Sequence, residues 1–414
     1  GFDHHASYIG HARYWNPDFI VDGRDVPSQG WIDDISTDYA IAFMRRQKGS
    51  SKPWSMVVGF KAPHGPFEPP ERAKERFAGE RARAVPNLAT PVPYLGGASK
   101  RAGVTGPSAA AIPTNLDYFR CVSAADDCLG RLLDALEETG FASNTVVIYT
   151  SDNGFYLGEH GLGDKRSAYE ESLRVPLIVR DPSLPPGLRG RTVDEMVLNL
   201  DLAPTLCDYA GVPAPAAMQG RSWRSLLSGT AADWRQSWFY EYFAERQKNS
   251  RVPDITAVRT ADAKLILYPG HPDWSELFDL KVDPYETRNL FNDPSAAELR
   301  ARLEAEHDRL ARGVAYRVPD YTDRPEWWGK PGGADWRPPN IVESRLRYDA
   351  QGFSGSRVAD ASGNGNHGNA QRVTVVDGRD ARKALRFDGG GAIDVPKAKS
   401  LDPTGQSWTV EVVC

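Results

Sequence analysis

The forty residues "NLDYFRCVSAADDCLGRLLDALEETGFASNTVVIYTSDNG" (115–154) decide the fold class of this chain. Apolar residues recur at helical spacing over 115–140, with Asn115 suited to the N-cap and Gly140 to the C-terminal stop. The short apolar run over 145–150 predicts a strand, and the polar turn "SDNG" follows it directly. The stretch therefore predicts a helix–strand unit of an α/β sheet, with a polar turn at the carboxyl end of the strand.

Neighbouring segments extend this pattern. "WSMVVGF" (54–60) and "VPLIVR" (175–180) predict two further strands, and "LNLDLAPTLCDYAG" (198–211) predicts another helix. The alternation predicts a mixed, mostly parallel sheet with helices on both faces. Because ligands of such sheets bind beyond the carboxyl ends of the strands, we expect the loop after 54–60 and the turn after 145–150 to meet in one crevice.

After about residue 235 the pattern changes. Four short apolar runs, a turn at 260–262 and an amphipathic stretch over 294–313 predict the strands, hairpin and helix of a small α+β subdomain. Later residues alternate in polarity and are rich in turn residues, which is typical of an all-β fold. We therefore predict four regions: a main α/β domain (1–235), an α+β subdomain (236–318), a Pro/Trp-rich linker or strap (319–342) and an incomplete β-sandwich (343–414).

Composition restricts the classes of partner. The 414 residues carry a net charge of −5 with cations spread along the chain, whereas nucleic acid requires a broad basic face. No apolar run approaches the length that spans a bilayer. We therefore expect no nucleic acid partner and no membrane span, and a few placed cations would have to recognise an anionic ligand. The oligomeric state is left open.

Asp152 and Asn153 place two oxygen donors side by side in a turn that ends in glycine. Hard cations such as calcium take six to eight oxygen ligands, so the pair would form part of a metal site. The same residue types also make ordinary turns after strands, and composition alone does not separate the two interpretations.

Basic side chains occur near both predicted loops. Lys165 and Arg166 follow the turn closely enough to fold back on it, and a lysine supplies a compact charge to an oxyanion. His64 stands between Pro63 and the Gly-Pro pair at 65–66, so its direction is restricted before a ligand arrives, as a proton donor requires. Each of these side chains, taken alone, also fits an ordinary surface or loop position.

Five segments in this order carry a resemblance to a known family: "GFKAPHGPFEPP", "YTSDNGFYLGEHGLGDKRSAYEESLRVPLIV", "NLDLAPTLCDYAG", "AVRTADAKLI" and "ELFDLKVDPYETRNL". Together they resemble the formylglycine-dependent sulfatases of the alkaline-phosphatase-like superfamily, over roughly residues 1 to 315. The resemblance implies that family's α/β fold and the hydrolysis of sulfate esters.

The resemblance also implies roles for single residues. Asp152 and Asn153 match the later pair of calcium ligands, Lys165 matches the lysine that contacts the sulfate group, and His64 matches the histidine that binds sulfate and protonates the departing alcohol oxygen. Five further positions are expected on the sugar side of the substrate: His160, Arg166, Glu170, Arg259 and His271.

The family's nucleophile is a hydrated formylglycine made from a cysteine or serine in a C/S-x-P/A-x-R signature. None of the four cysteines lies in that signature, and the family's early pair of aspartate ligands would precede Gly1. We therefore expect an N-terminally truncated chain that holds about half of an active site. By itself it would be inactive, whereas its parent would be a calcium-dependent sulfatase.

The C-terminal stretch from about residue 343 resembles the first strands of a laminin-G-like or concanavalin-A-like jelly roll, through "DASGNGNHG" and "ALRFDG". Such modules often bind carbohydrate. The resemblance therefore favours a sulfated polysaccharide or its oligosaccharides as substrate, and a periplasmic or extracellular location.

Two other functions remain open. A phosphatase or phosphodiesterase of the same superfamily would use zinc pairs with histidine ligands, whereas the pair Asp152–Asn153 suits calcium better. A degenerate, non-catalytic relative would only bind glycans. The presence of the nucleophile signature in the parent protein would decide between this last function and catalysis.

Overall fold

The computed structural model describes residues 2–95, 116–243 and 252–318, and the backbone of four strands between 348 and 394. The chain divides into two compact units. The first comprises residues 1–244 and 251–316, and the second comprises 245–250 and 317–414.

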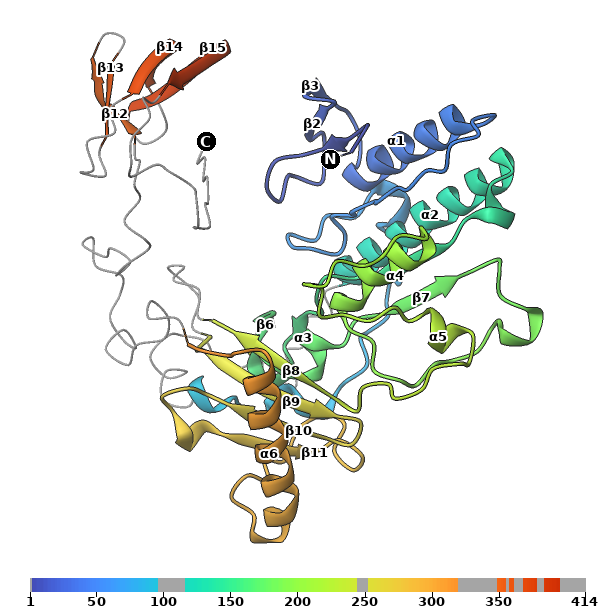
Figure 1. Ribbon diagram of the computed structural model, residues 1–414, viewed down its shortest axis with the longest axis vertical. Helices are drawn as coiled ribbons and strands as arrows, with labels where there is room; N and C mark the ends of the chain where they lie inside the picture. Colours follow the sequence, from blue (N-terminus) through green and yellow to red (C-terminus); the bar gives the residue numbers. More distant parts are fainter. Residues whose placement is uncertain are drawn as a thin grey trace. The chain divides into compact units, whose positions relative to one another are not determined.

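Two long helices form one layer of the first unit, α1 (Ile32–Gln47) and α2 (Leu116–Thr139) (Figure 1). The predicted helix over 115–140 is thus confirmed within a residue at each described end. Its buried positions recur at spacings of three and four, because one stripe of the helix faces α1. The residues of this contact are Ile32 and Met44 on α1, and Cys121, Ala124, Cys128, Leu132 and Leu136 on α2.

The strands predicted over 145–150 and 175–180 are confirmed as β4 (Val147–Thr150) and β7 (Leu177–Arg180). They pair in antiparallel fashion. The mixed α/β class is therefore correct, but all paired strands among the described residues are antiparallel, which differs from the mostly parallel pairing that we predicted.

The prediction of a strand over 54–60 is wrong for the described structure, where this segment has no assigned strand. A strand exists only through hydrogen bonds to a neighbouring strand, and its apolar sequence alone cannot supply them. Val57 is 73% exposed and Ile178 of β7 is 63% exposed, so apolar residues of both segments lie uncovered in this structure.

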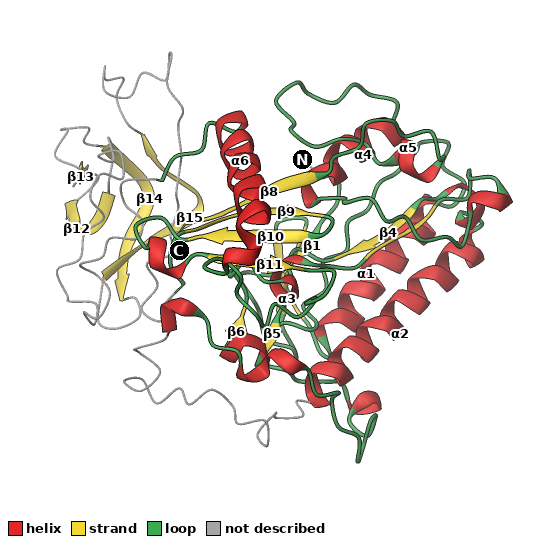
Figure 2. Cartoon of the chain, turned by 90° about the horizontal axis from the view of Figure 1, so that it is seen from below, coloured by secondary structure: helices red, strands yellow, loops and turns green. Residues whose placement is uncertain are grey.

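A four-stranded antiparallel sheet forms the second layer of the first unit. Its strands are β8 (Ser237–Tyr242), β9 (Ile255–Thr260), β10 (Ala263–Leu267) and β11 (Glu276–Asp279), in the order β11-β10-β9-β8. The helix α6 (Ala297–Gly313) packs against this sheet, with Leu303 in the core (Figures 1 and 2). The predicted hairpin at 260–262 is confirmed as the turn between β9 and β10.

Shorter elements complete the first unit. Residues predicted as a helix over 198–211 form a 3₁₀ turn (Asn199–Asp201) followed by α4 (Leu202–Tyr209). The remaining short helices and strands are β1 (Ala6–Ser7), β2 (Asp18–Val21), β3 (Arg24–Pro27), β5 (Tyr156–Leu157), β6 (Gly163–Asp164), α3 (Glu170–Leu173) and α5 (Arg224–Leu227).

The second unit contains four strands: β12 (Tyr348–Ser354), β13 (Arg357–Asp360), β14 (Gly368–Asp377) and β15 (Lys383–Asp394). They form one antiparallel sheet in sequence order, and the all-β character of the whole region remains a prediction. The predicted linker over 319–342 lies outside the described residues, and the predicted domain boundaries and jelly roll remain predictions. None of the helices that the structure describes is long and apolar enough to cross a membrane.

Candidate active site

The two loops that we expected to meet are in contact. Phe67, three residues after His64, lies edge-on to Phe155, with ring centroids 6.0 Å apart. Both rings also contact Tyr118 of α2. Aromatic packing therefore joins the loop after 54–60 to the turn after β4.

The start of the His64 loop is held by α1. Asp33, in the first turn of that helix and completely buried, accepts hydrogen bonds from the backbone N–H groups of Lys61 (2.7 Å) and Ala62 (2.9 Å). Burial raises the pKa of this carboxyl to about 6, although the two N–H groups act in the opposite direction. The loop is thus fixed before it reaches His64.

The ring of His64 is oriented by its own loop. Its Nδ1 lies 2.7 Å from the carbonyl oxygen of Gly65, and because a carbonyl only accepts, Nδ1 must carry the hydrogen. Nε2 is then the nitrogen that remains for a ligand. In the protonated ring, Nε2 can donate a proton to an oxygen, which is the chemistry expected of this residue.

His11 and Lys61 also belong to this site, and sequence reasoning missed both. The rings of His11 and His64 lie edge to face with centroids 4.3 Å apart. The pKa of His11 is lowered, first by His64, then by desolvation and by the charges of Lys61 and Lys165. The charge of Lys165 is thus one of those that lower the pKa of a ring in contact with His64. The sequence held a signal only for Lys61, which lies three residues before His64, whereas His11 lies in a distant segment.

Asp152 and Asn153 lie in the turn directly after β4. The Asp152 carboxylate is exposed, and in the described part of the chain it has no cationic partner; Ser151 Oγ lies 3.4 Å from it. The side-chain nitrogen of Asn153 donates to the carbonyl of Gly154 (2.8 Å), which leaves its oxygen as the second hard donor. These donors fit calcium, which prefers carboxylate and amide oxygens, but they are only two of the six to eight it takes.

Gly154 allows the turn that contains Asp152 and Asn153 to pack against α3. Its N–H donates to the carbonyl of Ser172 (2.8 Å), and a Cβ at this position would lie 1.9 Å from the carbonyl oxygen of Glu171. We expect Gly154→Ala to lower the free energy of unfolding by at least about 2 kcal/mol, because backbone must move to admit the methyl group. Chemical denaturation measures this value.

The matched control for that prediction is Gly130→Ala in α2. A Cβ there would meet no atom within 4 Å, so the substitution should raise stability through helix propensity. Equal stability of the two variants would contradict the assigned close contact.

Glu170 and Arg259, both expected on the sugar side, are paired with each other inside a buried network. Arg259 Nη2 lies 3.3 Å from Glu170 Oε2, and Lys264 Nζ lies 2.7 Å from Glu170 Oε1 and 2.8 Å from Glu286 Oε1. Burial alone would raise the pKa of Glu170, but Lys264 and Arg259 lower it to about 2. These contacts support a structural role more directly than a sugar-binding one.

Lys264 is the centre of this network and is completely buried. We expect Lys264→Met to destabilise the fold by roughly 3–5 kcal/mol, because it leaves the buried carboxylate of Glu286 without its cation and Glu170 with Arg259 alone. The double variant Lys264→Met, Glu286→Gln should recover part of the loss. Denaturation curves of both variants check this, with Lys281→Met, at a 73% exposed position, as the control.

His160 lies in the same interior region, and its predicted place on the substrate side remains a prediction. It is 1% exposed and its ring stacks on Tyr169 with centroids 3.9 Å apart. Its Nε2 lies 3.1 Å from Asn87 Nδ2, and desolvation followed by the charge of Lys264 lowers its pKa to about 4. His160 is therefore a neutral, buried histidine at neutral pH.

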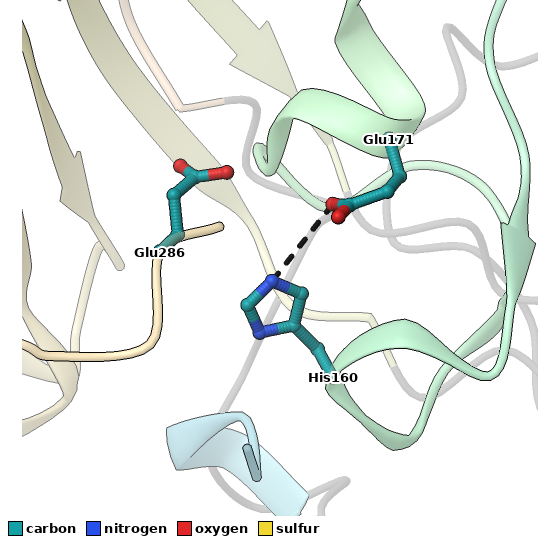
Figure 3. Close-up of side chains that lie close together, drawn as sticks. All are labelled: His160, Glu171 and Glu286. Atoms are coloured by element: carbon teal, nitrogen blue, oxygen red, sulfur yellow. Dashed lines mark ion pairs between the residues drawn. The ribbon is translucent and has the colours of Figure 1, made fainter. Parts of the chain in front are cut away.

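His160 also faces two carboxylates, Glu171 and Glu286, with one ligand atom from each residue within 4.8 Å of the others (Figure 3). Such a cluster can hold a metal ion. Here the ammonium group of Lys264 already lies 2.8 Å from Glu286, so the charge of that carboxylate has a partner in the protein itself. The cluster is better explained as part of the ion-pair network.

The last two expected sugar-side residues lie in different places. Arg166 directly follows Lys165 and forms an ion pair with Asp164, and its backbone N–H donates to Ser172 Oγ (3.0 Å). His271 lies in the loop after β10, where its ring stacks on Trp274 with centroids 3.8 Å apart. Their predicted role remains a prediction.

Comparison with known proteins defines the class. The model of the Sulfatase family matches residues 1–212, and that of the N-sulphoglucosamine sulphohydrolase C-terminal region matches residues 158–313. The chain belongs to the sulfatase family.

Individual relatives are similar over much of the chain. An N-acetylglucosamine-6-O-sulfatase of Bacteroides thetaiotaomicron is 30% identical over 371 residues, which cover 73% of this chain and 66% of the relative. A solved structure in complex with its substrate D-glucosamine-2-N,6-O-disulfate is 30% identical, with a TM-score of 0.66 and 76% of each chain covered. A phosphonate monoester hydrolase from Silicibacter pomeroyi is 26% identical, with a TM-score of 0.57, and covers 67% of this chain and 59% of that one. The chain thus spans about two thirds of the length of the N-acetylglucosamine-6-O-sulfatase and less than two thirds of the length of the phosphonate monoester hydrolase.

Proposed function

We propose that this protein, in its complete form, is a sulfatase that hydrolyses sulfate esters on the sugars of a sulfated polysaccharide or its oligosaccharides. The observation that supports this most is the contact between the rings of His64 and His11, which come from separate segments, in a site whose His64 loop is joined to the turn of Asp152 and Asn153. A sulfate monoester carries negative charge on its non-bridging oxygens, so a site of this composition suits it.

Each residue has a defined part in the proposed reaction. Lys165 stabilises the charge of the sulfate oxygens. His64 Nε2 gives a proton to the alcohol oxygen of the sugar as the ester bond breaks. Asp152 and Asn153 would hold a calcium ion, which supplies further positive charge to the sulfate group when bound.

The proposed nucleophile is a formylglycine, and no cysteine of these 414 residues lies in the signature from which it is made. The 414-residue chain assayed alone is therefore expected to show no turnover of sulfate esters. The activity of the complete protein would depend on a signature elsewhere in it.

Relatives support an amino sugar as the substrate. One similar protein is named for N-acetylglucosamine 6-O-sulfate, and a similar structure holds a glucosamine disulfate. We propose a 6-O-sulfated glucosamine residue within a glycan as the substrate class. The second unit of the chain would be a carbohydrate-binding jelly roll, and the protein would act in the periplasm or outside the cell, where such polymers occur.

The test is an assay of the complete protein on N-acetylglucosamine 6-sulfate, with 4-nitrophenyl phosphate and a phosphonate monoester as competing substrates. A kcat/KM at least ten times higher for the sulfate ester supports the proposal. The alternative function is hydrolysis of phosphonate monoesters, because the chain is similar to a phosphonate monoester hydrolase. A higher kcat/KM for the phosphonate than for the sulfate ester would support that alternative. No turnover with retained glycan binding would favour the non-catalytic function.

Calcium removal is a further prediction for the complete protein. Treatment with a chelator is expected to abolish turnover of the sulfate ester, and calcium should restore it, because the carboxylate of Asp152 and the amide oxygen of Asn153 are the hard oxygen donors that calcium prefers. Restoration by zinc and not by calcium would contradict the assigned ligands. Asp152→Asn should raise the calcium concentration required for half-maximal activity.

A further inference from the structure

We propose that His11 is a further substrate-contacting residue of the sulfate site, and that its imidazole donates a hydrogen bond to an oxygen of the sulfate group beside His64. This inference deepens the proposed function and rests on it. The residue lies in the segment "IGHARYW" (9–15), which shares no part with the loops recognised from the sequence.

The position of the ring is the first argument. Its centroid lies 4.3 Å from that of His64, with the ring planes at 64°. Two imidazole rings at this separation are in direct contact and line the same small region of the site. An anion that accepts a hydrogen bond from His64 therefore lies close to the ring of His11 as well.

The second argument is that the backbone of both histidines is fixed by reciprocal contacts. Lys61, near His64 in the chain, donates from Nζ to the carbonyl oxygen of His11 (2.7 Å). Tyr14, near His11, donates from its hydroxyl to the carbonyl oxygen of His64 (2.7 Å). Lys61 and Tyr14 are 5% and 1% exposed, and the ammonium lies 4.8 Å from the tyrosine ring centroid.

The side chain of His11 remains exposed although its backbone is held in this way. Left-handed conformations on both sides, at Gly10 (φ 59°) and Ala12 (φ 46°), turn the chain sharply around it. An exposed imidazole contributes little to core packing. A backbone fixed around an exposed polar ring is the arrangement expected of a ligand contact.

The charges nearby favour a neutral ring as the donor. His64, Lys61 and Lys165 all lower the pKa of His11, and only Asp164 acts against them. A neutral imidazole keeps one N–H, which can donate to a sulfate oxygen. In this proposal His11 orients the sulfate without taking part in proton transfer, and the proton donor to the leaving group is His64.

Two substitutions in the complete protein separate hydrogen bonding from ring packing. His11→Phe keeps an aromatic ring against His64 but removes the donor, and His11→Gln keeps an N–H donor but removes the ring. We expect His11→Phe to lower kcat/KM for a sugar 6-O-sulfate by about 10- to 100-fold, and His11→Gln to stay within about fivefold of wild type. His5→Phe and His5→Gln are matched controls at an exposed histidine paired with Asp22, and both should leave the rate unchanged.

Wild-type activity of His11→Phe would overturn the proposal. So would an equal loss in both His11 variants, because the ring and not its N–H would then be the necessary part. Thermal unfolding of all four variants should match wild type, since both histidines are exposed.

Binding of inorganic sulfate to the 414-residue chain gives a readout that needs no nucleophile. Calorimetry should show a Kd about tenfold higher for His11→Phe than for wild type. Normal turnover of the wild-type complete protein with no effect of His11→Phe rejects this inference and leaves the proposed function intact. A wild-type complete protein that neither hydrolyses sulfate esters nor binds sulfate rejects the proposed function and this inference with it.

Discussion

His64→Ala in the complete enzyme is expected to lower kcat for a sugar 6-O-sulfate by about 10²–10⁴-fold, because the leaving alcohol oxygen then departs without a proton. The ring is positioned for this through Nδ1, which lies 2.7 Å from the carbonyl of Gly65 and leaves Nε2 for the substrate. Steady-state kinetics on the sugar sulfate measures the loss.

A substrate with a better leaving group makes this prediction specific. 4-Nitrophenyl sulfate releases a phenolate that needs little protonation, so His64→Ala should affect it much less than the sugar ester. A loss of equal size on both substrates would contradict proton donation and would indicate sulfate binding alone. His5→Ala, at an exposed histidine that pairs with Asp22, is the control and should match wild type on both.

Lys165→Ala is expected to lower kcat/KM by about 10²–10³-fold on both substrates, because the sulfate oxygens lose a positive charge in the transition state whatever the leaving group. The ammonium group lies 3.2 Å from Asp164, and its side chain is 21% exposed, so its removal should not unfold the protein. The two variants thus differ in their kinetics: the loss of rate in His64→Ala depends on the leaving group, whereas the loss in Lys165→Ala does not.

Lys281→Ala is the matched control for this variant, since that lysine is 73% exposed and pairs with Asp262. Wild-type rates in Lys165→Ala would reject the assigned role. Circular dichroism should show the same secondary structure for both lysine variants. A Lys165→Ala protein that has lost its fold would show that the residue is needed for structure.

The sequence predicted best the elements that have a long, regular pattern of apolar residues. The helix over 115–140 shows a clear apolar stripe, and the α6 helix and the β9–β10 hairpin follow equally direct signals. The strand expected over 54–60 had the right composition and failed, because strand formation depends on a partner that its own residues cannot specify. The direction of strand pairing depends likewise on residues distant in sequence.

In the candidate site, too, some features could be predicted from the sequence and others could not. The two loops expected to meet do so through Phe67 and Phe155, since both loops leave the same region of the fold. His11 could not be found, because its nearness to His64 arises from tertiary contacts between segments 50 residues apart. Glu170 and Arg259 resembled ligand residues because a buried ion pair and a binding site use the same charged side chains.

The network around Lys264 has a consequence for the synthesis of the protein. Glu170, a few residues after Lys165, pairs through its side chain with Arg259 and Lys264 and through its N–H with Glu286. Chains emerge from the ribosome N-terminus first, so roughly 120 further residues must follow Lys165 before these contacts can close. Lys165 thus reaches its final position late in translation, after the residues that pair with Glu170 have been synthesised.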